Sequence, residues 1–154
     1  MTQLLDVYAP CAGELKSLSD VPDEVFSQKI VGEGIAIEPT IEDDETFKVK
    51  APFDGTILKL MPHAFVIAAS TGEALLVHVG IDTVEFAGEG FEHFVQEKDS
   101  VTRGQKLMKV DASALKEAKS LMCPVVALKP TQCTLVPVEN STLSTETVVL
   151  QLSS

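Results

Sequence analysis

The sequence predicts an all-β protein, an antiparallel sandwich or barrel-like fold with two short helical segments and pseudo-symmetric hairpin units. Short β-prone segments recur along almost the whole chain, and Gly, Pro, Asp and Ser separate them at close intervals. Such spacing leaves little room for long helices and is typical of sandwiches and barrels. A turn motif also occurs twice, and neither a linker nor a low-complexity tract divides the chain. We therefore expect a single domain spanning residues 1–154.

The expected strands follow one another at short spacing, each bounded by turn-forming residues. In the first part of the chain they lie near Leu4–Tyr8, Glu14–Leu18, Ile35–Glu38, Phe47–Ala51, Thr56–Met61 and Ala64–Ala68. In the second part they lie near Ala74–Val79, Phe91–Val95, Lys106–Val110, Val125–Leu128, Thr134–Val138 and Thr147–Leu152.

Two segments carry the signals of short helices. Pro22–Ser27 places a proline in the first turn with two acidic residues beside it, which favours a helix start. Ala112–Ser120 follows Asp111, a candidate N-cap, and puts Leu115 and Ala118 on one helical face. Both segments are too short to change the all-β prediction.

The repeated motif has the pattern A-P-x-x-G-x-aliphatic. It occurs at Ala9–Leu15 and again at Ala51–Ile57. In both copies Pro and Gly would form a turn that leads into a strand, so the same hairpin unit is expected twice.

Charge and composition limit the classes of partner. Acidic residues outnumber basic ones by 23 to 12, which gives a formal net charge of −11. Such a field repels phosphate backbones and anionic lipids, so we expect no nucleic acid partner, and it favours a protein partner with arginines or lysines around its own site. The apolar runs are too short for a membrane span and the N-terminus lacks a signal-peptide pattern, so we expect no membrane insertion and a cytoplasmic location.

The cysteines do not form a recognisable site. Cys11, Cys123 and Cys133 are widely spaced and include no C-x-x-C pair. We expect small core residues in a reducing compartment rather than zinc ligands.

Two of the three histidines, His63 and His78, can be brought face to face by a hairpin. If Ala69–Gly72 is a tight turn in which Ala69 pairs with Gly72, counting outward along the strands pairs His63 with His78. Directly opposed residues point to the same face, with Cβ atoms about 4.5–5.5 Å apart. The same register places Phe65 beside Leu76 on the histidine face, and Val66 beside Leu75 on the face expected to form the core.

Paired imidazoles suit phosphoryl chemistry. Neutral imidazole is a good nucleophile near pH 7, and a second ring could donate a hydrogen bond to the phosphoryl oxygens. Asp82, four residues beyond His78, could orient an imidazole or contact a partner's arginine. From the residues alone, the alternative is that both histidines simply pack on a strand face.

Six motifs in the same order resemble the glucose-type enzyme IIA family of the bacterial phosphoenolpyruvate-dependent sugar phosphotransferase system. Val77–Val84 resembles the family's phosphorylation motif, and His63–Phe65 its second histidine motif at the family's spacing. The others are Lys29–Ile37, Gly88–Phe91, Val101–Gly104 and Leu121–Val126.

The resemblance implies a phosphocarrier with an antiparallel β-sandwich fold. Its phosphoryl group would come from HPr onto Nε2 of His78 and pass to a cysteine of a IIB domain during sugar import, and His63 would hydrogen-bond that group. Asp82 and Asp23 would meet arginines of HPr and IIB. An apolar docking ring would consist of Phe26, Ile30, Val31, Leu76 and Val84, for each of which core packing is the alternative.

The resemblance implies no cofactor beyond the phosphohistidine intermediate, and the two imidazoles could at most attract adventitious zinc. It assigns no role to His93, which we expect to be an ordinary surface or strand residue. The chain departs from the family at Leu60–His63, a shorter turn in which Met61 stands where threonine or serine is common. The acidic stretch Ile41–Glu45 is expected to form a solvated loop.

Three other interpretations remain open at this point. A zinc hydrolase could use His78, Asp82 and His63 as ligands, although the H-x-H pair of related peptidases is absent. A swinging carrier domain could present Lys109, but only if that lysine lies at a hairpin tip. A family member could also serve only in regulation, by docking on transporters or enzymes.

Overall fold

The computed structural model describes residues 4–81, 89–138 and 140–153. It is an antiparallel β protein, as predicted, with every paired strand antiparallel to its neighbours. The first seven strands are β1 (Leu5–Tyr8), β2 (Gly13–Ser17), β3 (Gly34–Pro39), β4 (Thr46–Lys50), β5 (Gly55–Met61), β6 (Ala64–Ala68) and β7 (Ala74–His78). The others are β8 (Phe91–His93), β9 (Ser100–Val101), β10 (Lys106–Asp111), β11 (Cys123–Ala127), β12 (Gln132–Leu135), β13 (Thr142–Leu143) and β14 (Val148–Ser153).

All the expected strands are present, with boundaries shifted by a few residues. The largest shift is at β12, which ends at Leu135 rather than Val138. The sequence missed β9 and β13, which are two residues long and pair only at the ends of the large sheet. Two residues are too few to show a period-2 pattern, so only their pairing with β5 and β2 identifies them.

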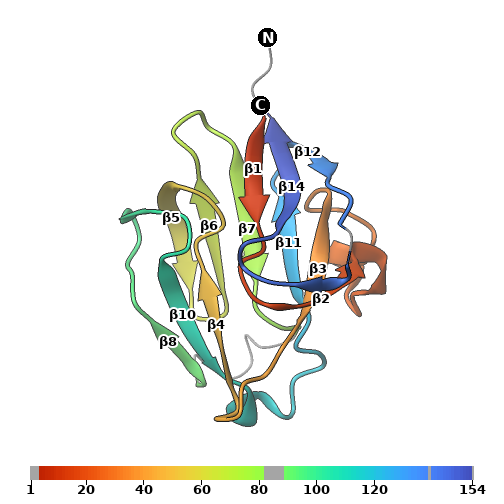
Figure 1. Cartoon of the computed structure of the whole chain (residues 1–154), viewed down its shortest axis with the longest axis vertical. Helices are drawn as coiled ribbons and strands as arrows, with labels where there is room; N and C mark the ends of the chain where they lie inside the picture. The colour runs from red at the N-terminus through yellow and green to blue at the C-terminus, as the bar shows by residue number, and fades with distance from the viewer. Residues whose placement is uncertain (1–3, 82–88, 139, 154) are drawn as a thin grey trace.

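The described residues form three sheets. The large sheet has the order β13-β2-β3-β11-β7-β6-β5-β9, and the two small sheets have the orders β1-β14-β12 and β4-β10-β8. In the view of Figure 1 the two small sheets overlie the large one. The main core contains residues of all three, among them Val7 and Leu150, Phe47 and Val110, and Phe65. The protein is therefore a sandwich with one continuous face opposed by two smaller ones.

The repeated motif forms two turns that bind one another. The amide of Tyr8 donates to the carbonyl of Pro52 at 3.0 Å, and the amide of Lys50 donates to the carbonyl of Pro10 at 2.7 Å. These two bonds are equivalent when one copy of the motif is superposed on the other in sequence. The repeat is thus an internal pseudo-two-fold relation, which confirms the prediction of a hairpin unit used twice.

The correspondence between the two motif copies extends to most of the two halves of the chain. The β1–β14 and β4–β10 ladders have equivalent registers, and each is interrupted by a bulge at the corresponding position. The β13–β2 pairing corresponds to β9–β5, and β12–β14 corresponds to β8–β10. The halves meet where β7 pairs with β11 in the centre of the large sheet.

The large sheet is covered on its outer face near the centre by a second, smaller apolar cluster. The connection between β2 and β3 contains the 3₁₀ helix η1 (Leu18–Asp20) and the α-helix α1 (Glu24–Ser27). Its apolar side chains pack on outward-facing residues of β3, β7 and β11, forming a cluster of Leu18, Val21, Phe26, Ala36, Ile81 and Val126 with Val31, Leu76 and Met122 at its margin. Every residue of β11 is buried as a result, because both of its faces are covered.

The helical segments differ in detail from the prediction. The first begins one residue beyond an Asp23 cap, so Pro22 lies outside the helix rather than in its first turn. The Asp23 carboxylate accepts the amide of Val25, and this supplies the first-turn partner that the helix needs. The second, η3 (Ala112–Leu115), has Asp111 as its N-cap, as predicted, but it is a short 3₁₀ helix. No helix within the described ranges is long and apolar enough to cross a membrane.

The cysteines are structural. Cys11 and Cys123 are buried, Cys133 is half-buried, and all three are free thiols. A hydrogen bond with the Cys123 thiol, followed by burial, raises the pKa of Cys11, while burial raises the pKa of Cys133 to about 11. The thiols of Cys11 and Cys133 therefore stay protonated and unreactive near neutral pH.

The glycines of the two motif copies are expected to be sensitive to substitution. A Cβ atom on Gly13 would lie 2.1 Å from the carbonyl oxygen of Glu38, and one on Gly55 would lie 2.5 Å from that of Ala68. Replacing either glycine by alanine should lower the free energy of unfolding by roughly 1–3 kcal/mol, because the neighbouring backbone has to shift. Urea denaturation checks this, with Ala12→Ser at an exposed position of the first turn as the control, expected within about 0.5 kcal/mol of wild type. Wild-type stability of both glycine variants would contradict the tight backbone approach.

Candidate functional site

His78 is the last residue of β7 and lies on the outer face of the large sheet. Along β7 the side chains of Leu75 and Val77 enter the main core, while those of Leu76 and His78 point outward. The ring of Phe26 from α1 lies against His78, with centroids 5.1 Å apart and planes at 57°. His78 is therefore placed at the border of the second apolar cluster and packed on one side.

The backbone after β7 sets the protonation of the His78 ring. Nδ1 of His78 lies 2.8 Å from the carbonyl oxygen of Gly80. A carbonyl oxygen can only accept, so Nδ1 carries the proton and, in the neutral ring, Nε2 carries the lone pair. Gly80 has φ of 74°, a conformation that glycine adopts without strain and that turns the chain here.

The register of the β6–β7 hairpin corrects the prediction by one residue. His78 pairs with Ala64, and the amide of Val79 donates to the carbonyl of His63 at 2.7 Å. The reason is the turn: Ala69 pairs with Glu73, and Gly72 adopts a φ of 103° inside a three-residue loop. A glycine with positive φ at this position is typical of three-residue hairpin loops, whereas the prediction assumed two residues.

The assignment of faces changes with the register. Phe65 lies opposite Val77, and both are fully buried in the main core. Val66 lies opposite Leu76 on the outer, partly exposed face that also carries His78. The predicted pairs Phe65–Leu76 and Val66–Leu75 were therefore wrong, because a slip of one residue exchanges the faces.

His63 reaches His78 from a turn rather than from a strand. Pro62 and His63 form the two-residue connection between β5 and β6, where Met61 pairs with Ala64. A bulge in β5 between Ile57 and Lys59 shifts the pairing so that two residues remain for this turn. The two imidazoles still meet, with ring centroids 4.8 Å apart and planes at 75°.

The two rings have different electrostatic surroundings. His63 is buried, and its Nδ1 has no hydrogen-bond partner among the described residues. Burial, followed by the charge that His78 can carry, lowers the pKa of His63. His63 is consequently a neutral ring near pH 7, able to donate one N–H.

The acidic candidates are only partly described. The Oδ1 atom of Asp23 caps α1, which gives this residue a structural role in holding Phe26 near His78. Asp82 and Val84 lie outside the described residues.

The apolar residues expected to form the docking ring differ in how exposed their side chains are. Phe26, Val31 and Leu76 pack in or against the second cluster, as the core-packing alternative expects. Ile30 exposes 58% of its surface and neighbours Val25, which exposes 45%. An exposed apolar pair beside this cluster is what a docking surface would present.

His93 has a contact that the sequence did not indicate. Its Nε2 lies 3.0 Å from the carbonyl oxygen of Pro62, the residue before His63. The two residues are 31 positions apart and belong to different sheets, so no local pattern could have suggested the bond.

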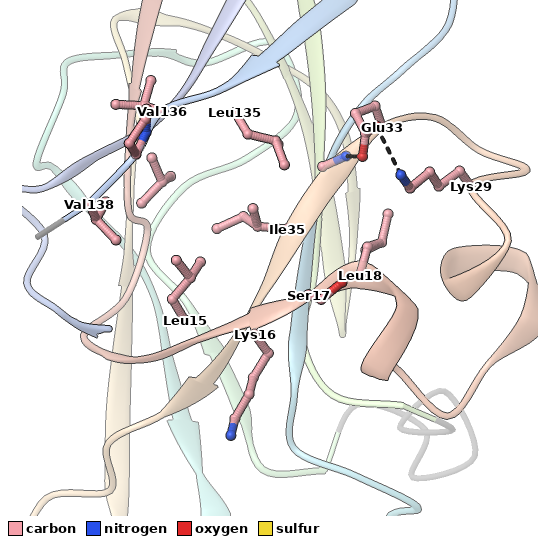
Figure 2. A pocket seen from close by; sticks show the side chains of 13 residues that line it. Leu15, Lys16, Ser17, Leu18, Lys29, Glu33, Ile35, Leu135, Val136 and Val138 are labelled. Carbon is pink, nitrogen blue, oxygen red and sulfur yellow. Dashed lines mark hydrogen bonds and ion pairs between the residues drawn. The ribbon is translucent and has the colours of Figure 1, made fainter. Parts of the chain in front are cut away.

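An apolar pocket of about 500 Å³ lies elsewhere, between the edge of the β1-β14-β12 sheet and strands β2 and β3. Figure 2 shows Leu15, Ile35 and Leu135 converging on it, with the Lys29–Glu33 ion pair (3.0 Å) at its rim. Neither His63 nor His78 lines it, so this pocket is separate from the histidine site.

Two of the other interpretations can be examined on the described residues. Lys109 lies inside β10, paired with Lys48 and Glu92, and not at a hairpin tip, which argues against a swinging carrier. Within the described ranges, no group of three or more His, Cys, Asp or Glu side chains is arranged to hold a metal ion. The ligand set of the hydrolase interpretation includes Asp82, which is not described.

Comparisons with known proteins agree with the resemblance. A family model described as phosphoenolpyruvate-dependent sugar phosphotransferase system, EIIA 1, matches residues 5–133. The solved structure of glucose permease IIA from Mycoplasma capricolum is similar over 97% of this chain and 96% of that one, with a TM-score of 0.86 and 35% identity.

Two curated relatives from Staphylococcus carnosus (strain TM300) are much longer than this chain. The glucose-specific and the glucoside-specific EIICBA components of the PTS system are each 46% identical to it over 123 residues. The match covers 78% of this chain but 18% and 17% of the relatives, so the chain spans less than a fifth of their length.

The lowered pKa of His63 predicts a stability change with pH. The folded protein keeps His63 neutral where the unfolded chain, with a pKa of about 6.5, already binds a proton. This contribution to the free energy of unfolding is fully present above about pH 6.5 and is lost as the pH falls toward the lowered folded-state pKa. Urea denaturation between pH 7.5 and 5.5 should show a smaller decrease for His63→Gln than for wild type. Parallel pH profiles of the two proteins would contradict the assignment.

Proposed function

Because the chain belongs to the EIIA 1 family of the phosphoenolpyruvate-dependent sugar phosphotransferase system and is a phosphotransferase component, we propose that His78 holds the phosphoryl group on its Nε2 atom. The observation that carries this assignment is the bond from Nδ1 of His78 to the carbonyl of Gly80. It leaves the lone pair of the neutral ring on Nε2, the nitrogen that must attack phosphorus.

The Gly80 carbonyl also assists the transfer. When Nε2 attacks the phosphorus of a phosphohistidine donor, the donor N–P bond breaks and its electron pair returns to the donor ring. The His78 ring becomes more positive while it keeps its proton on Nδ1, so the hydrogen bond to the Gly80 oxygen strengthens. This bond therefore stabilises the phosphorylated state more than the free one.

His63 contributes a neutral N–H donor. Its ring lies edge-on to His78 at 4.8 Å, close enough to approach a phosphoryl group on the neighbouring imidazole. A lowered pKa keeps it uncharged before transfer and makes it a weaker base, so it does not compete for the proton of His78. Donors positioned before reaction are the main contribution that a protein makes to phosphoryl transfer.

The partners follow from the same chemistry. HPr supplies the phosphoryl group and a cysteine of a IIB domain receives it during sugar import, in the cytoplasm. The net charge of −11 favours encounter with partners that surround their own site with arginines. Ile30 provides exposed apolar contact beside the second cluster, and Asp23 and Asp82 provide the acidic contacts.

Phosphorylation of purified protein tests the assignment of His78. With phosphoenolpyruvate, enzyme I and HPr, intact mass should show one acid-labile phosphate on wild type and on His63→Ala, but none on His78→Ala. Loss of the nucleophile abolishes the reaction, whereas loss of His63 should slow it roughly 10²-fold, the order expected for a donor in the transition state.

Omission of HPr serves as the control for direct labelling. Absence of phosphate on wild type, when enzyme I and HPr are active on another acceptor, would refute the phosphocarrier role. Full labelling of His78→Ala would move the acceptor to another residue.

The pKa of His63 should rise when His78 is phosphorylated. Before transfer, burial and the neighbouring imidazole lower it; afterwards a negatively charged phosphoryl group stands beside the ring and favours its protonated form. NMR titration of the ring protons of His63, with and without phosphoenolpyruvate, enzyme I and HPr, measures both values. An unchanged or lower pKa in the phosphorylated protein would mean that His63 does not contact the group.

A further inference from the structure

His93 ties the turn that carries His63 to the opposite sheet. It is the last residue of β8, where it pairs with Met108 in the β4-β10-β8 sheet. Its Nε2 atom donates to the carbonyl of Pro62, in the turn between β5 and β6 of the large sheet. The carbonyl that it holds belongs to the peptide bond whose nitrogen is that of His63.

This turn is poorly suited to a hairpin without such support. Two-residue hairpins prefer type I′ and II′ turns, both of which need positive φ at the first turn residue. Pro62 occupies that position, and its ring restricts φ to about −65°. His63 is not among the described residues with positive φ, which excludes a type II turn as well. The remaining turn conformations do not match strand twist, so the strands tend to splay at His63.

Two further hydrogen bonds complete the support. The carboxylate of Glu97, in the loop after β8, accepts the amide of Leu60 at 3.0 Å. The carbonyl of His63 accepts the amide of Val79 at 2.7 Å. Of the three bonds, only that of His93 reaches the turn itself from the opposite sheet.

We propose that His93 is a positioning residue for phosphoryl transfer, which acts by holding the Pro62–His63 turn so that the His63 ring stays edge-on to His78. The proposal rests on the proposed phosphocarrier function. The His93 ring donates from Nε2 in two forms: the neutral ring whose proton is on Nε2, and the ring protonated on both nitrogens. The bond to the Pro62 carbonyl therefore persists on protonation. Displacement of the turn by a fraction of an ångström would move His63 away from the phosphoryl group.

A double-mutant cycle tests the proposal. His93→Ala should lower the transfer rate at saturating phospho-HPr roughly tenfold, since small displacements near the reacting atoms have effects of this order or larger. His93→Gln, whose amide N–H can reach the same carbonyl, should restore most of the rate. In a His63→Ala background, His93→Ala should cause no further loss, because the group that it positions is gone. Glu92→Ala, an exposed neighbour on β8, is the matched control and should transfer at the wild-type rate.

The experiment distinguishes failure of the positioning role of His93 from failure of the phosphocarrier function. The proposal would be overturned if His93→Ala lowered the transfer rate equally with and without His63, or did not lower it at all. It would also be overturned if His93→Gln did not restore the rate. The ring ¹⁵N signals of His63 should shift in His93→Ala but not in Glu92→Ala; unshifted signals would also overturn it. Failure of wild type to accept phosphate would instead refute the phosphocarrier function, which the same assay reports independently.

Discussion

The pairing of β7 with β11 in the centre of the large sheet is the constraint on which the rest of the structure depends. Val77 lies opposite Val125 and Leu76 opposite Val126, so the two pseudo-symmetric halves join along this ladder. The inward side chains Val77 and Val125 enter the main core, and the outward side chains Leu76 and Val126 pack in or against the second cluster. Because both faces are packed, the register cannot slip, and the end of β7 is held at one place. His78 occupies that end.

The histidine site arises where the two halves cease to be equivalent. The connection between β2 and β3 is long and contains α1, whereas its counterpart between β5 and β6 is the two-residue turn of Pro62 and His63. The long connection brings Phe26 to one side of His78, and the short one brings His63 to another. The pseudo-symmetric scaffold thus positions His78, and its two unequal connections place Phe26 and His63 against that ring.

The neighbouring imidazoles are held in different ways. The Gly80 carbonyl directs the proton of His78 to Nδ1, which leaves the lone pair of the neutral ring on Nε2. Burial lowers the pKa of His63, so that ring remains a neutral donor. One ring is therefore controlled by a backbone hydrogen bond and the other by desolvation. This division allows two residues of the same type to take different roles 4.8 Å apart.

The sequence by itself determined the strand content, the repeated turn motif and the Asp111 cap, because these depend on local composition and short-range patterns. It predicted that His63 and His78 meet, but from a hairpin register that is wrong by one residue. It did not determine the register of the β6–β7 hairpin, which depends on the positive φ of Gly72 and on core burial of Phe65. Nor did it reveal the bond from His93 to Pro62, which joins two sheets. Such features come from packing between segments distant in the chain, so only the tertiary structure decided them.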